Sequence, residues 1–116
     1  MRFRPAARLN NEHVYADLFK KGQRHYFKAG MYISLANSLN HARLGLIVAK
    51  KKIRKAHERN YLKRLQRECF RAKQPALLGY DVVFVCNHKI GQLCQNQWFA
   101  LCQEDWRFLT KRLAKA

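Results

Sequence analysis

A chain of 116 residues and 13.8 kDa has room for one compact domain, and its 48% hydrophobic content supplies enough apolar surface to fold. Twenty-four Lys and Arg against seven Asp and Glu give a formal net charge of +17, which favours a polyanionic partner, above all nucleic acid. No stretch approaches the roughly 20 apolar residues that span a bilayer, and no signal-like apolar run follows the basic start, so we expect no membrane partner and a cytoplasmic location.

The beginning of the chain divides into a basic arm and a helix. Residues 1–10 carry Arg2, Arg4 and Arg8 without apolar periodicity, which predicts a basic N-terminal arm ahead of a single domain at 11–116. Between Asn11 and Lys21 the apolar residues recur at helical spacing, and a glycine follows. This pattern predicts the first helix.

Short apolar runs then occupy the segment from Gln23 to Val48, where glycine and a polar stretch separate them. The pattern predicts two or three antiparallel strands. The last run, Leu44–Val48, is apolar on both alternations, which is typical of a central strand covered on both faces.

The second half of the chain returns to helix, strand and helix. We expect a basic helix from about Ala56 to Lys73, a strand over Asp81–Cys86 and an amphipathic helix over Gln95–Leu113. The resulting order is α-β-β-β-α-β-α, an α+β domain with a four-stranded sheet packed against helices.

Catalytic and metal-binding patterns are sparse. The four cysteines contain no C-x-x-C pair, so we expect reduced, half-buried thiols and no metal site. His57 adjoins Glu58, but neighbouring helical residues point about 100° apart and do not converge on one substrate. We therefore predict no catalytic residue on this chain.

The basic segment from Lys50 to Lys73 carries nine of the seventeen net positive charges in 24 residues. On a helical wheel its cations form one stripe and its apolar residues a separate face that would dock on the sheet. The stripe comprises Lys55, Arg59, Lys63, Arg67 and Arg71, and the apolar face Tyr61, Leu62, Leu65, Cys69 and Ala72. Phe70 falls on the basic side, where it would either pack under the sheet edge or stack on a base. Like charges at i, i+4 repel, so the stripe indicates polyanion binding over a merely solvated face.

The stretch Arg43–Glu68 resembles the signature of the bacterial ribonuclease P protein family. The shared order is a strand, a lysine pair, an alanine, Arg59-Asn60, Lys63-Arg64 and Arg67-Glu68, and a looser similarity covers nearly the whole chain. One position departs from the family pattern, because Tyr61 stands where the family has a third motif arginine.

The resemblance implies a left-handed β-α-β crossover around the basic helix and a noncatalytic protein subunit. It assists an RNA subunit that binds magnesium and removes the 5′ leader of precursor tRNA endonucleolytically, with no cofactor on the protein and no obligate protein partner. The residues it assigns to the RNA subunit are Lys50, Arg54, Lys55, Arg59, Asn60, Lys63, Arg64 and Arg67; those it assigns to the leader are Tyr15, Phe19, Tyr32 and Lys51. Aromatic side chains suit a leader of variable sequence, because every base has a π face.

Other interpretations of the same residues remain. Tyr15 and Phe19 fit ordinary core packing of a short helix as well as a leader site. A ribosomal or general structured-RNA-binding protein without a processing role is the main alternative function, and a DNA-binding architectural protein is another.

Overall fold

The computed structural model describes Leu9 and residues 12–114, and the predicted basic arm lies outside these residues except for Leu9. The predicted order α-β-β-β-α-β-α is confirmed, with two short 3₁₀ helices added. The elements are α1 (Glu12–Lys21), β1 (Gln23–Tyr26), β2 (Gly30–Ala36), β3 (Arg43–Ile47), α2 (Ala56–Ala72), η2 (Gln74–Leu77), β4 (Tyr80–Cys86), η3 (His88–Gln92) and α3 (Gln95–Ala114).

The four strands form one mixed sheet in the order β1-β2-β4-β3. β2 pairs antiparallel with β1 and β4, whereas β3 pairs parallel with β4, from Arg43 opposite Asp81 to Ile47 opposite Val85. The predictions that Leu44–Val48 is central and that the early strands are all antiparallel are therefore wrong for β3. It is an edge strand, and its apolar character on both alternations reflects packing on both faces rather than a central place.

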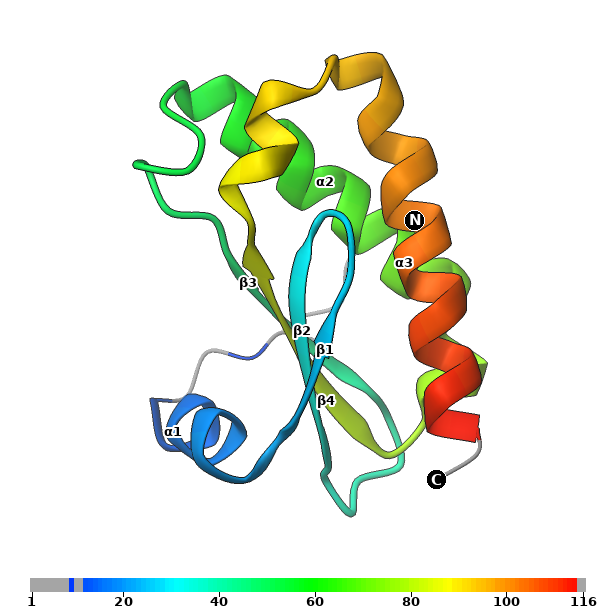
Figure 1. The fold of residues 1–116 in the computed structure, drawn as a ribbon. Helices are drawn as coiled ribbons and strands as arrows, with labels where there is room; N and C mark the ends of the chain where they lie inside the picture. The colour runs from blue at the N-terminus through cyan, green and yellow to red at the C-terminus, as the bar shows by residue number, and fades with distance from the viewer. Residues whose placement is uncertain (1–8, 10–11, 115–116) are drawn as a thin grey trace.

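Helices cover the two faces of the sheet unequally. α2 and α3 lie on one face, and α1 lies on the other (Figure 1). The larger core cluster joins β2, β4, α2 and α3, while a smaller one joins Leu18 of α1 to Ile33 and Val83. α2 links the parallel strands β3 and β4; the left-handed sense of this crossover stays a prediction of the resemblance.

A buried polar network joins the sheet to both long helices. Gln66 of α2 donates to the Tyr32 hydroxyl at 3.0 Å, and that hydroxyl donates to Asp105 of α3 at 3.1 Å. The Trp106 indole nitrogen donates to the Gln66 side-chain oxygen. Burial raises the pKa of Asp105, while the amide N–H groups of residues 28 and 29 and the Tyr32 hydroxyl stabilise its charged form. Each polar atom therefore has a partner inside the core.

The buried face of α2 is rotated from the predicted one. Gln66 and Phe70 are fully buried, whereas Ala72 is exposed. Phe70 packs edge to face on Trp106 with ring centroids 5.9 Å apart. This contact answers the question that the sequence left open, because a fully buried Phe70 belongs to the core and offers no face to a base. The rotation arises because α2 packs on α3 as well as on the sheet.

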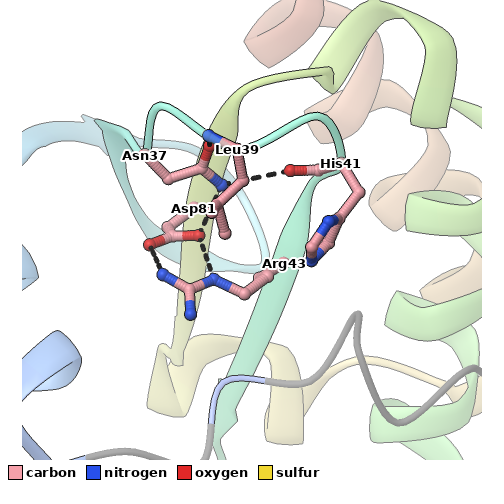
Figure 2. A network of polar contacts seen from close by, with 5 residues as sticks. All are labelled: Asn37, Leu39, His41, Arg43 and Asp81. Atoms are coloured by element: carbon pink, nitrogen blue, oxygen red, sulfur yellow. Dashed lines mark hydrogen bonds and ion pairs between the residues drawn. The ribbon is translucent and has the colours of Figure 1, made fainter.

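The loop between β2 and β3 is tied to the sheet through Asp81. Arg43 donates two hydrogen bonds to the Asp81 carboxylate, at 2.8 and 2.7 Å, and Asn37 donates a third at 2.8 Å (Figure 2). The Asn37 side chain also accepts from the backbone N–H of Leu39 at 2.8 Å. These bonds satisfy the buried Asp81 carboxylate, and the hydrogen bonds with Asp81 raise the pKa of Arg43.

The cysteines are free, as predicted, and three of them are buried. Burial raises the pKa of Cys69 to about 12 and of Cys86 to about 11, and it raises the pKa of Cys102 as well. Cys94 is exposed. None of the helices that the structure describes is long and apolar enough to cross a membrane.

Candidate nucleic-acid interface

The first candidate surface comprises α2 and the loop that precedes it, and we call it the basic surface. It contains the eight residues that the resemblance assigns to the RNA subunit. Lys50, Arg54, Lys55, Asn60 and Arg64 are exposed, while Arg59, Lys63 and Arg67 are half-buried. Because the apolar residues of α2 point into the core, the helix presents its cations outward.

Arg59 ties the loop to the helix. Its guanidinium donates to the backbone carbonyls of Ile53 at 3.0 Å and Arg54 at 2.6 Å. Lys55 occupies the N-cap position without a side-chain cap. Arg59 satisfies carbonyls of the loop, not the N–H groups of the first turn, and its two hydrogen bonds hold the loop against α2. Sequence reasoning assigned Arg59 to RNA alone and missed this structural role.

The loop before α2 is anchored in the core. The backbone N–H groups of Lys52 and Ile53 donate to the Ala49 carbonyl at 3.0 and 3.2 Å, which closes a turn. Ile53 is buried in the main core cluster together with Ile90 of η3. The backbone of this loop is thus held in place, and Lys50 and Lys51 project from it into solvent.

The acidic residues of α2 do little to neutralise the basic surface. Glu58 accepts a hydrogen bond from Gln95 of α3 at 2.6 Å. Glu68 lies 3.5 Å from Arg64, whose side chain is 74% exposed, and an exposed pair of this kind contributes only about 0.3–0.5 kcal/mol. The positive potential of the surface therefore persists.

The second candidate surface is α1 with the part of the sheet beneath it, and we call it the α1 surface. Leu18 is fully buried there, and Val14 and Tyr15 pack beside it. The Tyr15 ring lies directly over Gly45 of β3, where a Cβ would overlap the hydroxyl. Burial raises the pKa of Tyr15, and a hydrogen bond with the Leu46 backbone opposes that rise. α1 is thus fixed on the edge strand by a glycine that admits an aromatic ring.

The α1 surface continues onto the sheet. Met31, Leu35, Ile47 and Val85 are partly exposed beside the α1 cluster, so apolar surface remains open to solvent there. Leu9 closes one side of this surface, because it is buried in the same cluster and its N–H donates to the Leu44 carbonyl at 2.9 Å.

The four residues assigned to the leader lie in three different parts of the structure. Tyr15 is half-buried and Phe19 is 38% exposed, so both belong to the α1 surface. Lys51 is exposed in the loop after β3, and within the described part of the chain it has no hydrogen bond or ion pair to α1. Tyr32 lies on the opposite face of the sheet, fully buried in the polar network under α3. Its assignment to the leader is therefore wrong, because strand alternation turns residue 32 away from α1.

Arg24 is a neighbour of this surface that sequence reasoning missed. Its guanidinium donates to the Phe19 carbonyl at 2.9 Å and so satisfies an acceptor near the end of α1. The side chain is exposed and places a cation at the end of α1, against the Phe19 backbone. The only available signal in the sequence was the basic residue two positions after Gly22.

Groups of metal-binding side chains are absent from the residues that the structure describes: no three His, Cys, Asp or Glu come together in a way that could hold a metal ion. The magnesium that the resemblance assigns to the RNA-containing holoenzyme stays a prediction about that RNA. What the two surfaces can offer is binding, through cations on one and through aromatic rings on the other.

Comparison with known proteins adds a family and several relatives. The family model described as Ribonuclease P matches residues 3–113. The ribonuclease P protein component of Haemophilus influenzae (strain PittGG) is 48% identical over 71 residues, which are 61% of this chain and 60% of that protein. The match thus spans less than two thirds of the relative's length.

Solved structures agree in fold. The RNase P protein from Thermotoga maritima superposes with a TM-score of 0.76 at 28% identity, over 90% of this chain and 96% of that one. The RNase P protein from Staphylococcus aureus reaches a TM-score of 0.79 at 22% identity, over 89% and 94% of the two chains, a similarity of fold alone. The similarity therefore extends over nearly the whole chain.

Proposed function

Because this chain belongs to the Ribonuclease P family, we propose that it is the protein subunit of ribonuclease P, which assists endonucleolytic removal of the 5′ leader from precursor tRNA. In this role the basic surface binds the catalytic RNA subunit and the α1 surface holds the single-stranded leader. The protein acts in the cytoplasm, and magnesium is bound by the RNA-containing holoenzyme.

The observation that carries this proposal is the outward display of the basic surface. Its cations stand on a helix whose opposite face is buried in the core, and the preceding loop is fixed by Arg59 and Ile53. Cations held at fixed positions suit a folded RNA, whose phosphates also have fixed positions. A flexible charged tail would bind with less geometric selectivity.

The α1 surface supports the second half of the proposal. Phe19 offers a partly exposed ring, and Arg24 places a guanidinium at the backbone carbonyl of the same residue. Stacking on such a ring contributes about 1–3 kcal/mol per base and tolerates any base, which suits leaders of differing sequence. Tyr15 supports the surface from below through its contact with Gly45.

The chemistry of cleavage is assigned to the RNA subunit. This chain binds the precursor tRNA and orients its leader, so that the scissile bond is held near the catalytic RNA. Neither candidate surface combines a general base with a nucleophile or an oxyanion site, as protein-catalysed hydrolysis would need.

The experiment that tests the proposal compares the binding of two RNAs, precursor tRNA and mature tRNA, to the reconstituted holoenzyme. We expect Phe19→Ala to weaken affinity for precursor tRNA by about 1–3 kcal/mol, through loss of stacking on the leader. Mature tRNA has no leader and should bind the variant and the parent protein equally. Equilibrium binding of both RNAs, measured beside the melting temperature of each protein, gives the answer.

A purely structural Phe19 predicts a different pattern. Removing a core phenylalanine costs roughly 3–5 kcal/mol of folding stability, and binding of both RNAs would then fall with the amount of folded protein. Phe99→Ala is the matched control, because Phe99 is 39% exposed on α3, on the other face of the sheet. Equal weakening of precursor and mature tRNA would refute the leader assignment.

A further inference from the structure

The β1–β2 hairpin and α3 lie on the side of the molecule away from α1 (Figure 1). Residues of the hairpin tip and of α3 line a groove there. Two adjoining cavities of about 370 and 670 Å³ share Phe27 and Phe108 as walls. Volumes of this size are typical of ligand sites. We call it the hairpin groove and define it by Tyr26, Phe27, Phe108, Lys111 and Arg112.

Two phenylalanine rings in the hairpin groove pack side by side, and an arginine guanidinium lies against each of them. The Phe27 and Phe108 ring centroids are 6.1 Å apart with their planes at 32°. The Arg112 guanidinium lies 4.7 Å from the Phe27 centroid, and that of Arg107 lies 5.3 Å from the Phe108 centroid. Both kinds of flat group are platforms on which a nucleobase stacks.

Much of this aromatic surface is open to solvent. Tyr26 is 71% exposed and Phe108 is 39% exposed, although each lines a cavity. Packing the hairpin on α3 does not require these exposed ring faces, because Asp105 already ties the two together through the amide N–H groups of Lys28 and Ala29. The exposed rings are therefore available to a ligand.

The charge of the hairpin groove selects an anionic ligand. Lys111 and Arg112 line the smaller cavity beside the two phenylalanine rings. The acidic residues of the larger cavity are engaged within the protein, since Glu104 pairs with Lys28 at 3.2 Å and Asp105 is buried. Positive charge next to exposed rings matches a chain that alternates phosphates and bases.

From these contacts we propose that the hairpin groove binds an unpaired segment of RNA. Its bases stack on the exposed rings of Tyr26 and Phe108, and its phosphates are held by Lys111 and Arg112. This site goes beyond the proposed function, because it is separate from both the basic surface and the α1 surface. An apolar peptide would fill the cavities without using the cations, so charge complementarity favours RNA.

The test is a titration of the full ¹⁵N-labelled chain with a short oligoadenylate, followed by NMR. We expect the amide signals of Phe27, Phe108 and Lys111 to shift together and to saturate at one Kd. Phe108→Leu keeps apolar bulk but removes the ring, and should raise that Kd at least about fivefold. Phe99→Leu is the matched control, since Phe99 lies on the same helix and is also 39% exposed, and it should leave the Kd unchanged.

A second pair of variants keeps the test decisive if Phe108→Leu unfolds the protein. Lys111→Gln should weaken binding at the same signals, whereas Lys73→Gln, at the C-cap of α2 and outside all three surfaces, should not. Shifts confined to α1 and α2 would overturn the proposal and leave the proposed function intact. Equal effects of Phe108→Leu and Phe99→Leu would also overturn it, as would equal shifts with inorganic polyphosphate, which has no bases to stack.

Discussion

At the scale of single residues, His25 couples the hairpin to the end of α3. The Arg112 guanidinium can only donate, so the His25 Nδ1 at 3.3 Å accepts, and the Nε2–H donates to the Ser34 hydroxyl at 2.9 Å. This arrangement requires a neutral ring. Burial lowers the pKa of His25, and the charge of Arg112 lowers it further.

This lowered pKa makes a prediction about stability. Below the ordinary pKa of 6.5 the unfolded chain takes up a proton that folded His25 resists, so the free energy of unfolding falls as the pH drops through and below 6.5. Above that range the contribution is fully present. Thermal melts between pH 7.5 and 5.5 should show a steeper loss for the parent protein than for His25→Gln. Identical pH profiles would contradict the prediction, because the other histidines are common to both proteins.

A second residue-scale prediction concerns Arg59. Arg59→Ala should weaken binding to the RNA subunit by roughly 1.5–3 kcal/mol, since it removes a charge-assisted contact and also frees the carbonyls of Ile53 and Arg54. Arg71→Ala removes the same charge from the last turn of α2, outside the assigned set, and should cost less. Filter binding with both variants measures the difference. Equal losses would mean that net charge alone determines affinity.

At the scale of elements, the seating of α1 on β3 depends on Gly45. In Gly45→Ala the new methyl group overlaps the Tyr15 ring, so we expect a loss of about 1–3 kcal/mol in unfolding free energy. Adding Tyr15→Phe removes the nearest overlapping atom and should restore part of the loss. Denaturant unfolding of the single and double variants tests this coupling. Additive losses would show that the contact between Tyr15 and Gly45 does not position the helix.

Periodicity predicted the elements well but not how they meet. The amphipathic helix predicted over Gln95–Leu113 is confirmed as α3, which buries the apolar residues Trp98, Cys102, Trp106, Leu109 and Leu113. On α2 the helical wheel did not predict that Gln66 is buried. The residue is polar, and it is buried because its side chain is hydrogen-bonded inside the core. The predicted place of β3 in the sheet was also wrong, since nothing local in the sequence shows that β3 pairs with β4, which follows it after a helix. Tyr32 was misassigned because the sequence did not show which face of β2 lies under α1.

At the scale of the whole molecule, the net charge of +17 makes a prediction about the proposed association with RNA. Binding of the RNA subunit should weaken with salt, with log K falling along log[salt] by about 0.7–0.9 for each phosphate neutralised. Affinities measured from low to moderate salt give this slope directly. A flat profile would exclude phosphate contacts as the main source of affinity.

The candidate site was predictable only in part. The cations of the basic surface could be assigned from the resemblance, and their exposure on α2 and its loop agrees with that assignment. The contact of Arg24 with the Phe19 carbonyl, five residues away, depends on how the chain turns after α1, and the contact between Phe27 and Phe108 joins two distant parts of the chain. Neither contact leaves a local pattern in the sequence.

The sheet order also constrains when the chain can fold during synthesis. β4 lies between β2 and β3, yet it is the last strand to be made, so the first 79 residues contain one hairpin and a β3 without its strand partner. The nascent chain therefore contains the basic segment of α2 before β4 is made and the sheet on which α2 packs can form. Pairings between distant segments form slowly, and here they wait until Cys86 has left the ribosome. The ribosome's own RNA is then the first polyanion that an unfolded α2 encounters.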